Sequence, residues 1–312
     1  MDLADMKKAF ESERHVYESA KLTFTGIDGY DVYNPSIPFC WRGKEYILGR
    51  VEKRERWASS CVRLFAKTGT DTWQLVPDAM IYPLEDPYVA FIGDEITMGG
   101  THVRKECGKV ATFNGYFYRG TDIDDLCYFT TGPDRMKDIR LVDLGGKIGV
   151  FSRPRGESIR KQYGSESVIG YAEINTLDEL SPAVIEKAEP IQGLFSDNQW
   201  GGCNQVYLLE DGTVGVVGHI SYRENDLSVY MNMSYVFDRT KHQASELKLL
   251  GTRACYPHGS CKVPKLADCV FTAGIVMRPD GKCDLYSGLG DVESGRIVID
   301  YPFKGHGPIV TL

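Results

Sequence analysis

The sequence lacks any long hydrophobic run. None of its 312 residues belongs to a stretch that approaches the ~20 apolar residues a membrane helix needs. The N-terminal stretch "MDLADMKKAFESERH" is charged where a signal peptide would be apolar. The composition, 42% hydrophobic and 25% charged, is that of a globular protein with a large core. We therefore expect a soluble, cytoplasmic protein with no membrane partner.

The sequence also lacks an excess of positive charge and closely paired cysteines. The formal net charge is -7, and this acidic balance argues against a nucleic-acid partner. The nine cysteines are an odd number, and no two of them form the C-x-x-C pair that is common in zinc sites. We expect reduced, mostly buried thiols and neither a structural metal nor a cofactor.

Helical periodicity is limited to two places. Met6, Phe10 and Tyr17 recur at near-helical spacing, and the stretch "LDELSPAVIEKAE" forms a second candidate. Most other segments have the character of strands. We expect a short N-terminal helical segment over residues 1–20, followed by an all-β catalytic domain over residues 21–312.

A pattern of apolar strand, glycine turn and apolar strand occurs five times. The turns are 50 to 69 residues apart and are centred on Gly43, Gly93, Gly146, Gly212 and Gly281. Each interval has room for about two further strands, which is the size of a four-stranded propeller blade. The repeat predicts a five-bladed β-propeller. An ordinary antiparallel sandwich, in which hairpins also recur, is the alternative.

Polar residues lie far from the glycine turns, at the opposite ends of the hairpin strands. They are seven to ten residues from the nearest such turn and comprise Asn34, Arg50, Asp86, Arg153, His219 and Asp291. Strand residues rise about 3.3 Å each, so these side chains should share one edge of the sheets. If the first two strands of each blade line the central channel, the residues converge on one mouth of it. We predict the ligand site there.

Five stretches between Tyr33 and Arg296 also resemble a known family when taken together. In chain order they are "YNPSIPFCWRGKEYILGRVEKR" followed by "PLEDP", then "DRMKDIRLVDLGGKIGVFSRP", "VGHISYRENDLSVYMNMSYVFD" and "YSGLGDVESGR". They resemble motifs of glycoside hydrolase family 130, the five-bladed β-mannoside phosphorylases. The whole pattern is similar to glycosyltransferase family 108, whose dual mannosyltransferase/phosphorylases build and degrade β-1,2-mannan.

The resemblance implies an inverting β-1,2-mannosyltransferase/phosphorylase. Its donors would be GDP-mannose and mannose 1-phosphate, and its other ligands would be phosphate and β-mannan oligosaccharides. Two alternatives stay open, a plain β-mannoside phosphorylase and a non-catalytic carbohydrate-binding propeller. Asp86 matches the family's general acid, which acts through a sugar hydroxyl. The triplet "EDP" could also be a simple turn at the start of a strand.

The resemblance further assigns binding residues. Asn34, Arg50 and Asp291 match positions that hold mannose hydroxyls, and Glu85 is a weaker candidate beside Asp86. A phosphate pocket suits guanidinium groups supplemented by neutral donors. The matching positions for phosphate are Arg135, Arg153, His219 and Tyr230, with Arg155 as a spare candidate.

The sequence departs from the family at several places. Tyr88 replaces the arginine after Glu-Asp-Pro, and Ser152 replaces a histidine. No glutamate precedes the last hairpin, where Lys262 and Lys265 stand instead, and we predict that these lysines bind the second phosphate of a nucleotide sugar. The acidic stretch at 121–126 imitates the metal-binding Asp-x-Asp of other glycosyltransferases. Because it precedes a strand and the expected pocket is already cationic, we expect no metal there.

Overall fold

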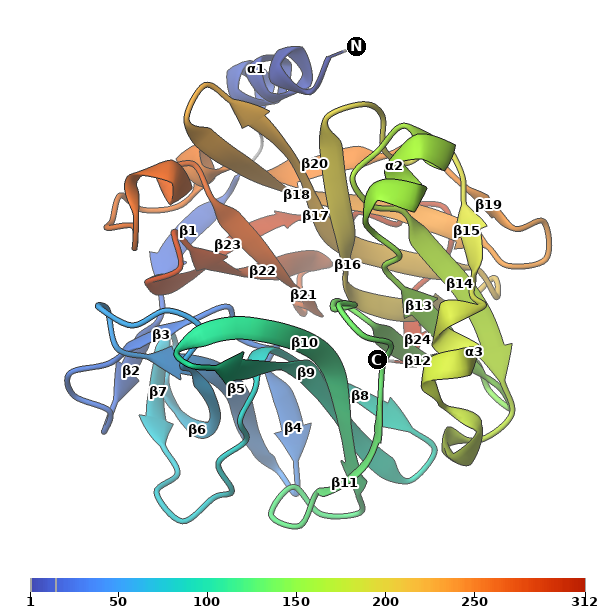
Figure 1. The fold of residues 1–312 in the computed structure, drawn as a ribbon. Coiled ribbons are helices and arrows are strands. Elements are labelled where there is room, and N and C mark those ends of the chain that lie inside the picture. The colour runs from blue at the N-terminus through green and yellow to red at the C-terminus, as the bar shows by residue number, and fades with distance from the viewer. Residues whose placement is uncertain (1, 15, 312) are drawn as a thin grey trace.

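Strands dominate the structure, a computed structural model that describes residues 2–14 and 16–311. Within these residues the strands form five sheets, arranged around a central axis (Figure 1). The prediction of an all-β, five-bladed propeller with a short N-terminal helix is therefore confirmed. The sandwich alternative is wrong, because no two of these five sheets alone enclose the core.

Each blade is a largely antiparallel sheet of four to six strands. Blade 1 consists of β2 (Thr23–Thr25), β3 (Asp31–Tyr33), β4 (Phe39–Trp41), β5 (Lys44–Glu52), β6 (Cys61–Gly69) and β7 (Thr72–Leu75). Blade 2 consists of β8 (Glu85–Ile92), β9 (Glu95–Glu106), β10 (Lys109–Gly120) and β11 (Cys127–Thr131). Blade 3 consists of β12 (Arg140–Asp143), β13 (Ile148–Ser152), β14 (Ile169–Ile174) and β15 (Glu189–Ile191).

The last two blades complete the ring. Blade 4 consists of β16 (Gln199–Leu209), β17 (Val214–Glu224), β18 (Leu227–Asp238), β19 (Gln243–Ala244), β20 (Lys248–Gly251) and β24 (Ile309–Thr311). Blade 5 consists of β21 (Val270–Met277), β22 (Lys282–Leu289), β23 (Glu293–Asp300) and β1 (Glu18–Lys21). The helices are α1 (Leu3–Glu13), α2 (Glu157–Tyr163) and α3 (Pro182–Glu186), with short 3-10 turns at Leu177–Glu179, Arg253–Cys255 and Pro264–Leu266.

Each of the five glycine turns of the sequence repeat connects the two strands of a hairpin near the start of its blade. Their φ angles lie between 57° and 128°, a backbone region that side chains other than glycine rarely adopt. Along each hairpin, one strand end is therefore fixed at the glycine turn. The other end reaches the opposite face of the propeller, where the polar residues gather.

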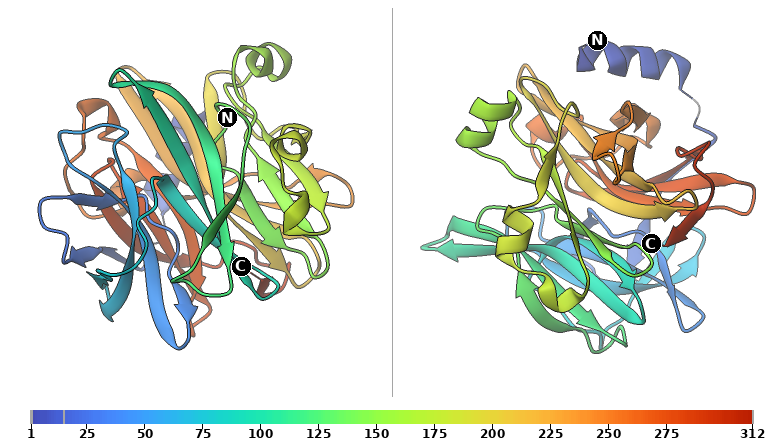
Figure 2. Two further views of the ribbon diagram at one scale, coloured as in Figure 1. Left: turned by 60° about the horizontal axis from the view of Figure 1, so that its bottom comes forward. Right: turned by 90° about the vertical axis from the view of Figure 1, so that its right-hand side faces the viewer.

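The ring is closed by the N-terminal part of the chain. Strand β1 pairs antiparallel with β23, with Ala20 opposite Arg296, and so forms the outer strand of the last blade. Helix α1 lies outside the ring, where Leu3 is buried and the Lys7 ammonium lies 2.6 Å from the Asp268 carboxylate (Figure 2). In the described part of the chain, no helix has the length and apolar character needed to cross a membrane.

Candidate active site

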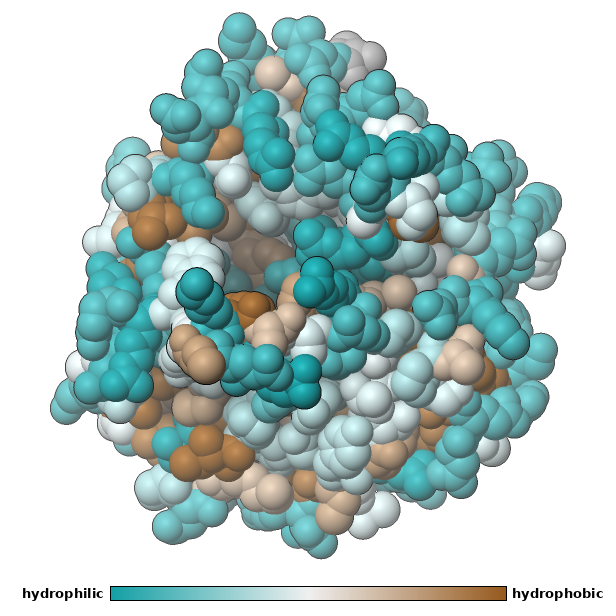
Figure 3. Space-filling model, viewed as in Figure 1, coloured by the Kyte–Doolittle hydropathy of each residue, from teal (hydrophilic) through white to brown (hydrophobic). Residues whose placement is uncertain are grey.

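A cavity of about 390 Å³ opens at the centre of the propeller face seen in Figure 1. Figure 3 shows it as a hollow surrounded mostly by hydrophilic side chains. All five blades or their connecting segments line it. The structure brings these sequence-predicted residues together there: Asn34, Arg50, Glu85, Asp86, Arg153, His219, Tyr230 and Asp291.

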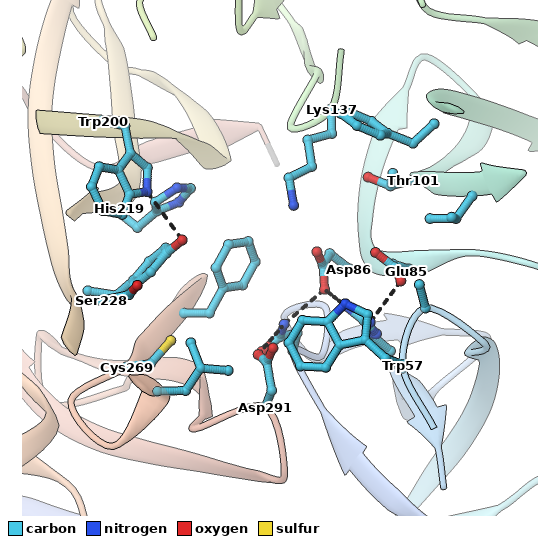
Figure 4. Close-up of a pocket in the computed structure, with 18 of the residues that line it drawn as sticks. Trp57, Glu85, Asp86, Thr101, Lys137, Trp200, His219, Ser228, Cys269 and Asp291 are labelled. Atoms are coloured by element: carbon cyan, nitrogen blue, oxygen red, sulfur yellow. Dashed lines mark hydrogen bonds and ion pairs between the residues drawn. The ribbon is translucent and has the colours of Figure 1, made fainter. Parts of the chain in front are cut away.

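The Glu-Asp-Pro triplet forms a bulge in β8. Glu85 is paired with Thr101 of β9, but the next paired residue is Tyr88, opposite Gly99, so Asp86 and Pro87 are left out of the ladder. Proline has no N–H to donate, which makes a bulge one of the few places in a sheet that accept it. The bulge points the Asp86 side chain into the cavity (Figure 4).

Asp86 forms a buried cluster with the carboxylates of Glu85 and Asp291. The side-chain amide of Asn34 and the guanidinium of Arg50 hydrogen-bond to this cluster. The Asn34 Nδ2 group donates to Asp86 Oδ1 at 2.9 Å and to Asp291 Oδ1 at 3.4 Å. Arg50 donates from Nη1 to Asp86 Oδ1 at 3.0 Å and from Nη2 to Glu85 Oε1 at 2.8 Å. Side chains from blades 1, 2 and 5 thus meet at one point of the cavity wall.

The backbone of this cluster is strained. Asn34, Asp86 and Asp291 have φ angles of 44°, 49° and 57°, in the left-handed region that asparagine and aspartate tolerate better than most residues. Blade 5 approaches Asn34 so closely that a Cβ on Gly288 would lie 1.8 Å from Asn34 Oδ1. Only glycine fits there without displacing Asn34.

The carboxylates of the cluster differ in pKa. Burial pushes the pKa of Asp86 upward, but Arg50, Lys137 and the Asn34 amide outweigh burial and hold it below its ordinary value. For Asp291, burial is the largest cause and raises the pKa above its ordinary value, although Arg50 opposes the shift. Burial likewise raises the pKa of Glu85 against the pull of Arg50. Asp86 is therefore the carboxylate of the cluster that stays ionised most readily.

Arg153 lies on another wall of the cavity and is only 4% exposed. Its Nη1 donates to Asp138 Oδ2 at 2.5 Å, which fixes the guanidinium plane. Burial tends to raise the pKa of Asp138, but Arg153 and other nearby cations hold it well below its ordinary value. The Nε of Arg153 is buried and has no hydrogen-bond partner among the described residues. An unpaired buried donor of this kind is commonly satisfied by a bound water or ligand.

His219 is a neutral imidazole in this site. Burial and the neighbouring Arg153 lower its pKa to about 3. Its Nδ1 lies 2.8 Å from Oδ1 of Asn204, which occupies a bulge of β16, so Nδ1 carries the proton and the other ring nitrogen is an acceptor. That nitrogen suits the hydrogen of a sugar hydroxyl or of a protonated phosphate oxygen.

Tyr230 lies beside His219, with ring centroids 5.6 Å apart. Its hydroxyl oxygen accepts a hydrogen bond from Trp200 Nε1 at 3.2 Å, so its own proton is free to be donated. Burial raises the pKa of Tyr230 to about 12, which keeps the hydroxyl protonated at neutral pH. Trp200 was not among the residues predicted from the sequence.

Arg135 is the predicted phosphate residue that the structure does not bring to the cavity. Its side chain is 71% exposed and lies 4.0 Å from Asp134. Lys137, two residues later, lines the cavity instead, and its ammonium points into the centre (Figure 4). The signal was present in the stretch "DRMKDIR", because the lysine belongs to the motif that resembles the family's Lys-Asp strand.

The two lysines before the last hairpin also differ in position. Lys262 is buried in an ion pair with Glu52, which accepts a second hydrogen bond from the Tyr33 hydroxyl at 2.6 Å. The prediction that Lys262 binds a diphosphate is wrong, since its charge is already neutralised inside the protein. Lys265 does line the cavity, with its ammonium 5.8 Å from the ring centroid of Trp57.

A family model described as "Protein of unknown function (DUF1861)" matches residues 8–305. The chain belongs to this family. Solved structures relate the family to sugar enzymes of Leishmania mexicana. The chain is 52% identical to MPT-4, a mannose phosphorylase solved with a phosphate ion, with a TM-score of 0.93 over 99% of this chain and 96% of MPT-4.

A second Leishmania mexicana protein of similar structure is MPT-1, a GDP-Man-dependent mannosyltransferase. The identity is 46% and the TM-score 0.92, over 99% of this chain and 97% of MPT-1. The β-1,2-mannobiose phosphorylase of Listeria innocua shares the fold at 13% identity, with a TM-score of 0.62 over 88% of this chain and 91% of that one. The resemblance inferred from the sequence motifs is confirmed. No curated protein matches the chain.

Proposed function

We propose that this DUF1861 protein is an inverting β-1,2-mannosyltransferase/phosphorylase. The observation that carries the proposal is the division of one cavity into two parts. A carboxylate cluster around Asp86 and Asn34 suits a hexose, while Arg153, Tyr230 and Lys137 suit a phosphate. The high identity to a mannose phosphorylase and to a GDP-Man-dependent mannosyltransferase supports this assignment.

In the direction of transfer, the donor is α-mannose 1-phosphate or GDP-mannose and the acceptor is a β-1,2-mannan hydroxyl. The acceptor oxygen attacks C1 of mannose from the face opposite the phosphate, and the bond from C1 to the phosphate oxygen breaks. Asp86, ionised beside Arg50, receives the proton of the attacking hydroxyl, directly or through a mannose hydroxyl. Arg153 stabilises the charge on the departing phosphate.

In the reverse direction, phosphate attacks C1 of the terminal mannose and the glycosidic bond breaks. Asp86 now gives its proton to the leaving oxygen, by the same route. One carboxylate is sufficient because phosphate, unlike water, arrives as an anion and needs no base. Inversion connects the α-configured phosphate to the β-configured mannoside in both directions.

The two alternatives predict different behaviour. A plain β-mannoside phosphorylase would use phosphate and mannose 1-phosphate but ignore GDP-mannose. A carbohydrate-binding propeller would retain the sugar contacts without a placed proton carrier. The strained bulge that directs Asp86 into the cavity favours an enzyme, since a sugar-binding protein gains little from a strained carboxylate held in one place.

Two incubations of the purified protein test the proposal. The first contains GDP-mannose and β-1,2-mannan oligosaccharides, and we expect elongated oligosaccharides and GDP. The second contains phosphate and the same oligosaccharides, and we expect mannose 1-phosphate. A protein that binds the oligosaccharides but forms neither product would be a binding module, and the proposal would be wrong.

A further inference from the structure

Arg155 is a second cavity arginine, two residues after Arg153. Both follow the end of β13, and both line the same cavity. The backbone of Arg155 is held by a bridge to Ser167, which fixes where the side chain starts. Its guanidinium lies 5.9 Å from the ring centroid of Phe113, on the wall contributed by blade 2.

The other arginines that line the cavity have carboxylate partners, but Arg155 does not have one among the described residues. Arg50 is paired with Glu85 and Asp86, Arg153 is paired with Asp138, and Arg223 lies 3.4 Å from Glu166. No ion pair or hydrogen bond to the Arg155 side chain is found within residues 2–14 and 16–311. Burial and the repulsion from Arg153 lower the pKa of Arg155. This cavity therefore holds a guanidinium whose charge the protein does not neutralise.

A donor with one phosphate does not require this second guanidinium. Arg153, Lys137 and Tyr230 already provide donors for a single phosphate group. Arg155 adds a second guanidinium close enough to Arg153 to feel its charge. Arg223, which also lines the cavity, packs 5.3 Å from the ring centroid of Trp200. Arg155 is an exposed residue of the cavity lining, so an anion that enters from solvent can reach its guanidinium.

We propose that Arg155, assisted by Arg223, binds the second phosphate of a nucleoside diphosphate sugar donor. This inference rests on the proposed mannosyltransferase function and replaces the earlier assignment of a diphosphate to Lys262. The first phosphate of the donor occupies the Arg153 pocket, and the second lies against Arg155. A planar guanidinium can meet two oxygens of that phosphate at once. The nucleoside then lies on the Arg223 and Trp200 side of the cavity.

The kinetic test compares two donors in the Arg155→Ala variant. We expect the KM for GDP-mannose to rise about 10-fold to 100-fold, since charge-assisted contacts are lost. The KM for mannose 1-phosphate should change less than about threefold, as that donor carries no second phosphate. Arg160→Ala is the matched control, because it removes an exposed arginine of α2 outside the cavity and should affect neither donor.

A binding measurement separates this inference from the proposed function. Titration calorimetry would compare GDP, GMP and inorganic phosphate on the wild type, Arg155→Ala and Arg155→Lys, each checked for folding by circular dichroism. We expect Arg155→Ala to weaken the binding of GDP and of GMP, which both carry the nucleoside-linked phosphate, and to leave the binding of inorganic phosphate nearly unchanged. Equal losses for all three ligands would overturn the inference, and so would unchanged binding of GDP and GMP. Phosphorolysis without any GDP binding would overturn it while leaving the mannoside phosphorylase activity intact.

Discussion

The side-chain amide of Asn34 donates a hydrogen bond to Asp86 Oδ1 over 2.9 Å, across the boundary between blades 1 and 2. The same amide also donates a hydrogen bond to Asp291 of blade 5, so one side chain connects three blades at the cavity. Its carbonyl oxygen, Oδ1, is buried and has no partner among the described residues. A buried acceptor without a partner is costly, and a sugar hydroxyl would satisfy it.

Asp86→Asn should abolish turnover while leaving the fold intact. The amide can keep the left-handed backbone but cannot carry the proton, and we expect a loss of about 10²–10⁴-fold in both transfer and phosphorolysis. Initial rates in each direction, with circular dichroism for folding, would measure this. Asp94→Asn, in the exposed turn of the same blade, is the matched control. Near-normal rates in a folded Asp86→Asn variant would move the proton carrier to Asp291.

Gly288→Ala should damage the site through Asn34. The added Cβ would lie 1.8 Å from Asn34 Oδ1 and 2.6 Å from its backbone N, so Asn34 must move away from Asp86. We expect a loss of about 1–3 kcal/mol in the free energy of unfolding and a larger relative loss in turnover. Denaturant unfolding and initial rates would be compared with Gly69→Ala, whose Cβ meets only ordinary contacts with Thr72. Unchanged turnover would show that Asn34 does not position Asp86.

Arg153→Lys should discriminate between the ligands. Lysine keeps the charge but loses the fork that binds Asp138 and an anion together. We expect the KM for phosphate and mannose 1-phosphate to rise about tenfold or more, because a charge-assisted bidentate contact is lost. The KM for β-1,2-mannan should stay within a factor of a few. Equal losses for charged and neutral ligands would contradict the assignment of this wall to phosphate.

The pH dependence of transfer should differ from that of phosphorolysis. Transfer uses the ionised form of Asp86, whose pKa is lowered, so its rate should hold from neutral pH down toward the ordinary aspartate pKa of about 3.9. Phosphorolysis uses the protonated form and should accelerate as the pH falls. The transfer rate would be measured with α-mannosyl fluoride as the donor, because this donor has no phosphate whose own titration would change the rate. A transfer rate that already falls near pH 6 would instead point to a base with a raised pKa, such as Asp291.

The sequence predicted the features that depend on local chemistry. The five glycine turns require a positive φ, and hairpins of similar length then bring residues such as Asn34 and His219 to one face. The motif that resembles the family's Lys-Asp strand pointed to Lys137, but it could not exclude Arg135, because the positions of the two side chains depend on how a loop without regular structure turns. The same is true of Lys262 and Glu52, which are 210 residues apart and meet only when blades 1 and 5 are adjacent.

Closure of the ring joins parts of the cavity that are synthesised far apart in time. Strand β1 leaves the ribosome well before its partner β23, which lies more than 250 residues later in the chain. Asn34 in the first blade and Asp291 in the last meet only after this pairing. Chains are synthesised at about 5–20 residues per second, so a nascent chain carries Asn34, Arg50 and Asp86 for many seconds before Asp291 exists. The carboxylate cluster of the cavity is therefore complete only after synthesis of blade 5.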